Sequence, residues 1–229
     1  MKKLLTFLAL MLFAGGASFA QCNEMFDYQS GTSWQWTNYD KKGKFMGKSM
    51  QKIEVLNKLS NGFEVTISVV QSDKNGEQIG PFSMDMACKD GVVYFDMKKF
   101  IPDEHLNDPE GEATVDVIGD NLEMPINMKA GDYLKDASVS MTIGGSGSPM
   151  GIKMTVDIFD RKVESEEKLN TPAGEFDCFV ITQTMKTKMV MSMQMESKEW
   201  YSPGIGMVKS ESFKKGKLMS YSILTQFSK

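Results

Sequence analysis

The chain has 229 residues, of which 26 are basic and 30 are acidic, so its formal net charge is −4. This balance argues against nucleic acid as a partner, because nucleic-acid binding rewards clustered Lys and Arg, and against electrostatic adhesion to an anionic membrane. A chain of this length buries a sufficient core without disulfide staples. It fits one β-rich domain or two small ones, and no boundary splits it.

The N-terminus has the features of a secretory signal peptide. Two lysines precede an apolar run over residues 4–13, and Ser18 and Ala20 occupy the −3 and −1 positions of a signal-peptidase site. The run is shorter than the roughly 20 residues that a membrane-spanning helix needs. We therefore predict a signal peptide over residues 1–20, no transmembrane helix in the mature chain, and export to the periplasm, the outer membrane or the medium.

Gln21 and Cys22 leave two outcomes open at the cleavage site. A lipoprotein signal places a small residue directly before the cysteine that receives the lipid, and Gln21 is large and polar. Cleavage before Gln21 without lipidation is the favoured alternative, and it predicts a mature domain that spans residues 21–229.

The mature chain shows strands separated by turns. Apolar and polar residues alternate with period two in several runs, which is typical of half-buried strands: 63–69, 82–88, 139–143, 152–158, 189–195 and 218–224. Gly, Asn and Asp, which accept the backbone of tight turns, mark hairpin tips at 40–44, 73–77, 89–91 and 214–217. This spacing predicts an all-β fold, an antiparallel curved sheet that forms a barrel or half-barrel with little helix.

Three segments interrupt the strand pattern. Residues 122–134 contain Pro125 and Gly131 and are predicted to form a loop. Residues 100–111 are acidic, with one predicted helical turn near His105, and 144–149 are a Gly- and Ser-rich tip. A lone His among carboxylates is more often a solvated surface residue than half of a metal or catalytic site, and the acidic stretch lacks the oxygen spacing of a calcium loop.

Two hairpin segments resemble each other. Residues 39–46 read YDKKGKFM and residues 213–219 read FKKGKLM. Two hairpins of similar chemistry explain this echo, and a duplicated half-barrel is the alternative.

The methionines are the compositional outlier, since the chain has 20. Soft thioethers suit Cu(I), but copper sites usually recruit His and this chain has one. Packing of the methionines in a solid core is the favoured explanation, because methionine fills irregular space. A barrel lined by these flexible side chains also accepts an apolar ligand. The candidates for lining such a cavity are Met154, Val156, Met185, Met189, Met191, Met193 and Met195.

The three cysteines suggest one disulfide and one leftover thiol in an oxidising compartment, and Cys22, Cys88 and Cys178 are all candidates. The sequence does not determine which two cysteines pair, and Cys88 and Cys178 fit equally well as small buried apolar side chains.

The known catalytic and cofactor-binding motifs are missing from the sequence. The chain lacks a nucleophile elbow, a phosphate loop and any C-x-x-C pair. We therefore predict no catalytic residue, no metal, no cofactor and no enzyme.

Two tryptophans lie close together near the start of the predicted mature chain. Trp34 and Trp36 share one strand face and are predicted to anchor a core or a rim.

The third tryptophan begins a distinctive motif. Residues 200–211 read WYSPGIGMVKSE, and this segment resembles the signature of the TapB-like group of exported bacterial proteins. Residues 31–44, 171–178 and 214–218 fit the same pattern in order. The resemblance implies an antiparallel barrel or half-barrel in the cell envelope, with no known activity and no catalytic residues to carry over.

Together these features predict an exported, non-catalytic binding module whose apolar cavity carries a lipid or a lipoprotein. The alternative is a structural or interaction protein of the envelope with a packed core and no small-molecule ligand. The expected partner is an apolar small molecule or an envelope protein.

Overall fold

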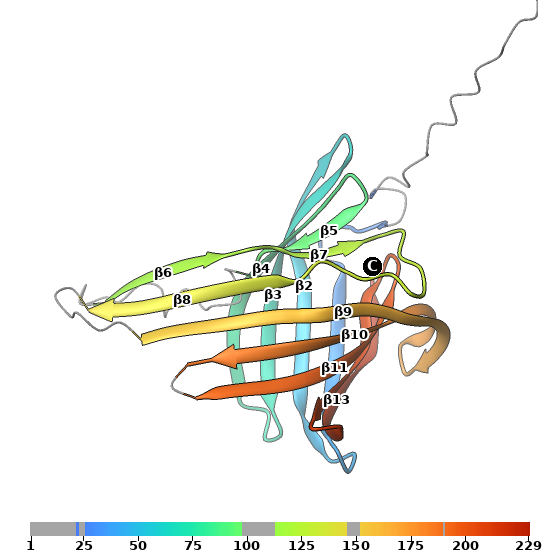
Figure 1. Cartoon of the computed structure of the whole chain (residues 1–229). Helices are drawn as coiled ribbons and strands as arrows, with labels where there is room; N and C mark the ends of the chain where they lie inside the picture. The colour runs from blue at the N-terminus through green and yellow to red at the C-terminus, as the bar shows by residue number, and fades with distance from the viewer. Residues whose placement is uncertain (1–21, 23–25, 98–112, 146–151, 190) are drawn as a thin grey trace, which may run out of the picture.

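The computed structural model describes Cys22 and residues 26–97, 113–145, 152–189 and 191–229. Within them the chain is built from antiparallel strands with almost no helix (Figure 1). The strands are β1 (Ser33–Asp40), β2 (Phe45–Leu59), β3 (Gly62–Asp73), β4 (Gln78–Lys89), β5 (Val92–Phe95), β6 (Ala113–Gly119), β7 (Leu122–Pro125), β8 (Ala137–Gly145), β9 (Ile152–Thr171), β10 (Gly174–Lys188), β11 (Ser192–Ser202), β12 (Gly206–Lys214) and β13 (Lys217–Ser228).

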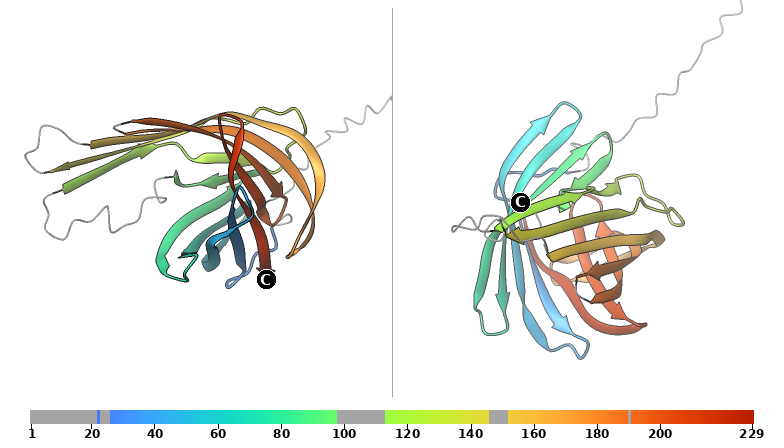
Figure 2. Two further views of the ribbon diagram at one scale, coloured as in Figure 1. Left: turned by 90° about the horizontal axis from the view of Figure 1, so that it is seen from below. Right: turned by 60° about the vertical axis from the view of Figure 1, so that its left-hand side comes forward.

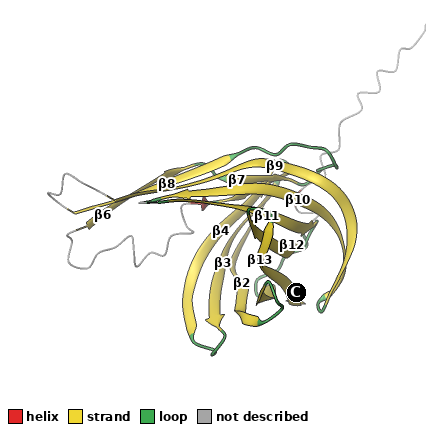
Figure 3. Cartoon of the chain, turned by 60° about the horizontal axis from the view of Figure 1, so that its bottom comes forward, coloured by secondary structure: helices red, strands yellow, loops and turns green. Residues whose placement is uncertain are grey.

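All of these strands belong to one sheet with the order β6-β8-β9-β10-β11-β12-β13-β1-β2-β3-β4-β5-β7. The sheet curls, so that β2, β3 and β4 face β9, β10 and β11 across the inside of the curl (Figures 2 and 3). Its two end strands, β6 and β7, do not pair with each other, so the sheet stays open. The predicted curved antiparallel sheet with little helix is confirmed.

The predicted turns lie where the sequence indicated them. The turns after Asp40, Asp73, Lys89 and Lys214 each join two paired strands. Gly43, Gly76, Gly91 and Gly216 have φ between +70° and +86° in these turns, a backbone region that glycine enters without steric cost. Local turn chemistry therefore fixes the hairpins of this sheet.

The segment 122–134 corrects one prediction, because its first residues form β7 rather than a loop. Leu122 to Pro125 pair with β5, and Met124 is buried opposite Val93. Pro125 is compatible with this strand because it is the last residue of a strand at the end of the sheet, where its missing N–H removes no ladder hydrogen bond. The proline ends the strand; it does not prevent it.

The gap between β7 and β9 is bridged by the segment that follows β7. The backbone N–H groups of Gly131 and Leu134 donate to the carbonyls of Val163 and Arg161, at 2.7 and 2.9 Å. Val163 donates in return to the carbonyl of Asp132 at 2.9 Å. These backbone bonds hold the two sides of the curled sheet together where no strand ladder does.

The main core lies inside the curled part of the sheet and takes side chains from β1 to β5, from β7 and from β9 to β13. Ile53, Val163, Val180 and Leu224 are fully buried there, and Phe63 packs edge-on against Phe26 with ring centroids 5.6 Å apart. A second, smaller cluster of Met97, Ala137, Val139 and Ile158 lies where β8 and β9 leave the curled part. Among the described residues, no helix has the length and apolarity needed to cross a membrane.

Candidate functional site

The hollow of the curled sheet contains a pocket of about 310 Å³. This volume lies at the lower end of the range of roughly 300–1,000 Å³ that small-molecule sites occupy. Strands from both sides of the curl contribute to it, so the pocket exists only because the sheet bends. Its lining is mainly aromatic, aliphatic and thioether: Tyr28, Trp34, Trp36, Gln51, Ile67, Met84, Met86, Phe95, Leu122, Met124, Arg161, Glu199, Tyr201, Ile205, Gly206 and Met207.

The aromatic wall of the pocket is attached to the turn between β11 and β12. The indole N–H groups of Trp34 and Trp36 donate to the backbone carbonyls of Ile205 and Met207, each at 3.0 Å. The Tyr28 hydroxyl donates to the same Ile205 carbonyl at 3.4 Å. Buried indole N–H groups need such partners. The W-Y-x-P-G-x-G motif and the residue directly after it thus supply the carbonyls that orient the tryptophan rings.

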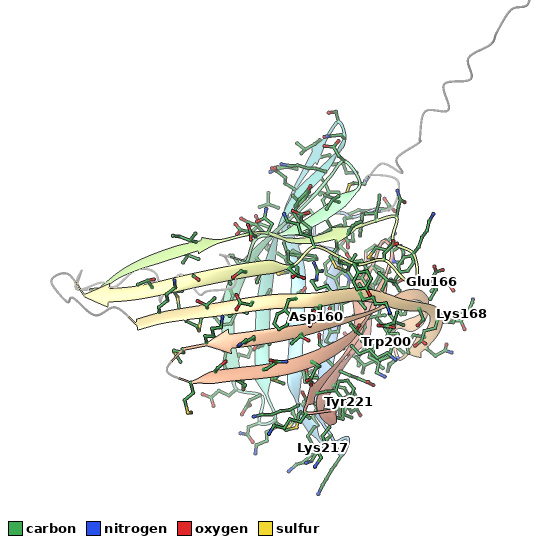
Figure 4. The ribbon with its side chains drawn as sticks, in the orientation of Figure 1. Asp160, Glu166, Lys168, Trp200, Lys217 and Tyr221 are labelled. Carbon is green, nitrogen blue, oxygen red and sulfur yellow. A yellow bond between two sulfur atoms is a disulfide. The ribbon has the colours of Figure 1, made fainter. Side chains whose placement is uncertain are left out.

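Arg161 is the buried cation of the site, with 1% of its surface exposed. A β-bulge places it there, because Asp160 and Arg161 on β9 together face the single residue Gln183 on β10. Asp160, labelled in Figure 4, has φ +54°, the left-handed conformation that such a bulge uses. The extra residue redirects the Arg161 side chain toward β7.

The guanidinium group of Arg161 connects β9, β10 and β7. Its Nε–H donates to the Gln183 side-chain oxygen at 3.1 Å, and one terminal nitrogen donates to the carbonyls of Glu123 and Lys135. The other terminal nitrogen lies 3.1 Å from the Met124 sulfur, a weak acceptor. Among the described residues, the positive charge is therefore held by carbonyls and an amide, and no carboxylate is bonded to it directly.

Glu199 provides the negative charge of the pocket wall. Its carboxylate accepts from the Gln183 side-chain N–H at 2.9 Å and from the Ser197 hydroxyl at 3.3 Å. Gln183 thus bridges Arg161 and Glu199. Burial raises the pKa of the Glu199 carboxyl, while the two hydrogen bonds and the Arg161 charge oppose that rise. The lining of the pocket is therefore mainly apolar, and Arg161, Gln183 and Glu199 form a polar group at its wall whose charges compensate each other.

The seven predicted cavity residues do not line this pocket. The structure places four of them on the surface, with Met185, Met189, Met191 and Met193 exposed by 38, 58, 84 and 46%. The other three are half-buried: Met154, Val156 and Met195.

The reason is that residues 189–195 do not form the single strand that their alternation indicated. β10 ends at Lys188 and β11 begins at Ser192, so Met189 and Met191 lie in a turn at the tip of a hairpin. Met185 pairs with Met195 across this hairpin. A turn followed by the first residues of a strand preserves the same alternation, and periodicity alone does not distinguish this arrangement from one continuous strand.

The structure joins Cys22 to Cys88 in a disulfide and leaves Cys178 as a free, buried thiol. Both bridged cysteines are fully buried within the main core. Cys178 on β10 lies near Glu167 and Asp177; burial first, and then these carboxylates, raise the pKa of its thiol to about 12.

We expect the Cys178 thiol to react with a thiol reagent at pH 8 at least about tenfold more slowly in the native protein than in urea. The thiolate is the reactive form, and burial with a pKa near 12 keeps its population very small. Stopped-flow colour change with an aromatic disulfide reagent measures both rates. Equal rates would show that β10 opens freely around this residue.

The predicted signal peptide, residues 146–149 of the Gly- and Ser-rich tip, and His105 with its acidic neighbours lie outside the described residues. Gly144 and Gly145, the first residues of that predicted tip, are instead the last residues of β8. Among the residues that the structure describes, no group of three or more His, Cys, Asp or Glu side chains is placed to hold a metal ion.

Arg161, Glu199 and Met124 line the site, although none of them was among the residues predicted from the sequence. The available signal was the Asp160–Arg161 pair inside an otherwise alternating strand, a departure from period two that marks a bulge. Trp34 and Trp36 were identified as same-face anchors, and the structure buries both, with 4 and 6% of their surfaces exposed.

This curled, open, antiparallel sheet around an apolar hollow defines the class of the protein, and comparison with known proteins gives its family. The DUF3108-like family model matches residues 29–224, and the chain belongs to this family. The TapB-like name is not confirmed. A search of curated proteins found no match.

Two solved structures share the fold. The chain is 25% identical to a Bacteroides fragilis protein described as exported with a YmcC-like fold; the TM-score is 0.70, and 90% of this chain and 99% of that chain are covered. It is also 25% identical to a protein described as a lipoprotein from Parabacteroides distasonis, with a TM-score of 0.70 and coverage of 89% and 99%. Neither description names an activity.

Proposed function

We propose that the protein is an exported, non-catalytic binding protein of the cell envelope that holds an apolar ligand in the pocket of the curled sheet. The pocket carries this proposal, because tryptophan, methionine and aliphatic side chains line a partly open space of about 310 Å³. A close-packed core leaves few voids larger than a water molecule. The descriptions of the two related structures as exported and as a lipoprotein support the envelope location.

The wall chemistry indicates the kind of ligand. Methionine side chains at Met84, Met86 and Met124 adapt to varied apolar shapes, and the flat faces of Trp34 and Trp36 lie against the same space. Most polar groups of the wall already have protein partners, so the walls favour burial of hydrocarbon over recognition of a sugar or a nucleotide. The volume suits one acyl chain or a compact apolar molecule.

A fluorescent fatty acid tests this proposal. We expect a dansyl-labelled fatty acid to bind the mature protein with an increase of dansyl emission, and excitation of Trp34 and Trp36 to transfer energy to the probe, because both indoles line the pocket. Native mass spectrometry of the purified protein provides an independent search for a retained ligand. Failure of the probe to bind, together with a ligand-free mass, would favour the alternative of a structural or interaction protein of the envelope with a packed core and no small-molecule ligand.

Met84→Trp is expected to weaken binding of the probe by about tenfold or more. Met84 is a half-buried lining residue on β4, and a larger ring there takes up space that the ligand needs. Met191→Trp is the matched control, since Met191 is 84% exposed on the distant hairpin tip. Equal weakening by both variants would place the probe on the surface and not in the pocket.

A further inference from the structure

The tips of the two similar hairpins found in the sequence lie side by side. The tip of the β1–β2 hairpin carries Lys41, Lys42 and Lys44, and the tip of the β12–β13 hairpin carries Lys214, Lys215 and Lys217. We call these six residues together the lysine tips. β1 pairs with β13, so the two turns emerge next to each other.

Direct contacts hold the two turns together. The Lys41 backbone N–H donates to the Met219 carbonyl at 3.0 Å. Tyr39 and Tyr221 stack with ring centroids 5.0 Å apart and planes inclined by 20°. Figure 4 shows Tyr221 and Lys217 close together at this end of the molecule. The lysine tips are therefore one surface on a fixed base.

The charge of the lysine tips is left for a partner. All six lysines are exposed, and none forms an ion pair with another residue of the described ranges. The nearest carboxylate in the turn, Asp40, accepts hydrogen bonds from the backbone N–H groups of Lys42 and Lys44 at 2.8 and 2.9 Å. These bonds keep Asp40 ionised as a turn-forming group, and the surface keeps a clear positive excess.

The neighbouring β3–β4 turn adds little to this balance. Gly47 of β2 pairs with Asp73 at the start of that turn, which also contains Lys74 and Glu77. Asp73 accepts backbone N–H groups within its own turn, from Asn75 and Glu77. Its two acidic side chains and one lysine leave the six-lysine surface positive.

Apolar side chains accompany the lysines. Phe45, Met46 and Met219 are exposed by 37, 48 and 40%, and each lies within two residues of a lysine of the tips. A surface with lysines around exposed aromatic and thioether groups is the composition of interfacial membrane anchors, in which the apolar groups enter the headgroup region and the ammonium groups meet phosphates.

We propose that the lysine tips dock the protein onto the surface of an anionic phospholipid bilayer. Lysine is a point charge that suits diffuse phosphate groups, whereas bidentate sites in folded partners favour arginine, which the tips lack. The exposed Phe45 and methionines distinguish this surface from a purely electrostatic one. The net charge of −4 argued against such adhesion, but the fold gathers six lysines where the sequence average does not show them. The proposal does not depend on the pocket.

Vesicle flotation of the mature chain tests the proposal. We expect it to float with vesicles of phosphatidylcholine and phosphatidylglycerol at low salt, to bind vesicles of phosphatidylcholine alone far more weakly, and to detach as salt screens the charges. The triple variant Lys214→Gln, Lys215→Asn, Lys217→Gln should weaken binding about 100-fold, from roughly fivefold for each lysine near an anionic surface. Asparagine is used at Lys215 because φ is +53° there.

The control variant makes the same change of charge elsewhere: Lys58→Gln, Lys129→Gln, Lys153→Gln, three exposed lysines away from the tips. It should keep nearly all of the vesicle binding. Loss of binding in the control to the same degree, or a wild-type chain that ignores anionic vesicles, would overturn the proposal. Retention of the wild-type chain on immobilised polyglutamate without binding to vesicles would assign the surface to an acidic protein instead.

Discussion

Arg161→Ala is expected to lower the free energy of unfolding by roughly 3–5 kcal/mol, the usual cost of removing one member of a buried charged network. The change deletes the hydrogen bonds to Gln183 and to the carbonyls of Glu123 and Lys135. It also leaves Glu199 in the pocket wall without its counter-charge. Urea denaturation followed by tryptophan fluorescence measures the effect.

Lys162→Ala is the matched control for this prediction. Lys162 is the next residue of β9, and its ammonium group meets Glu164 at the surface, where an exposed ion pair contributes at most about 1 kcal/mol. Arg161→Lys should recover only part of the loss, because one ammonium group cannot reach β7 and β10 together. If Arg161→Ala lowers the free energy of unfolding no more than Lys162→Ala does, the Arg161 side chain does not hold β7 against β9. The backbone bonds between β9 and the segment after β7 would then hold the two together alone.

Removal of the disulfide by Cys22→Ala with Cys88→Ala is expected to cost about 4 kcal/mol of stability. The bridge joins residues separated by 66 positions, and closing a loop of that length in the unfolded chain corresponds to this value in the chain-entropy model. It also fixes the N-terminal segment, whose Phe26 and Tyr28 rings pack on Phe63. Comparison of urea midpoints with and without a reductant gives the same quantity on the wild-type chain.

Cys178→Ala separates the effect of the bridge from that of losing a buried sulfur. It retains the disulfide and removes one small core group, which costs about 1 kcal/mol. Thiol titration of the unreduced, unfolded wild-type chain should count one thiol, since Cys178 is the free cysteine. A midpoint that does not move on reduction would show that the N-terminal segment is held by packing alone.

The pocket gives the W-Y-x-P-G-x-G segment a physical role. Pro203 and Gly204 turn the chain between β11 and β12, and the carbonyls of Ile205 and Met207 then face the indoles of Trp34 and Trp36. These tryptophans lie 171 residues away in sequence. The turn is therefore part of the wall of the hollow as well as a connection between strands.

The sequence by itself determined what local chemistry controls. Turn residues fixed four hairpin tips, and alternation identified the strands around Phe63, Met84 and Ile158 and the shared face of Trp34 and Trp36. Period two and tight turns are properties of a few neighbouring residues, so they can be recognised without knowledge of the partners. They failed at Met189 and Met191, which lie between two strands although the alternation continues through them, and at Leu122–Pro125, where a proline ended a strand.

Only the tertiary structure decided where the open sheet curls and which side chains meet inside the curl. The pocket depends on Arg161 reaching β7, which follows from one bulge and from contacts between segments 26 to 38 residues apart. The lysine tips depend on the pairing of β1 with β13 at opposite ends of the chain. The choice of Cys88 over Cys178 as the partner of Cys22 has the same origin. Such long-range juxtapositions follow from the curvature and order of the whole sheet, which no short window of sequence contains.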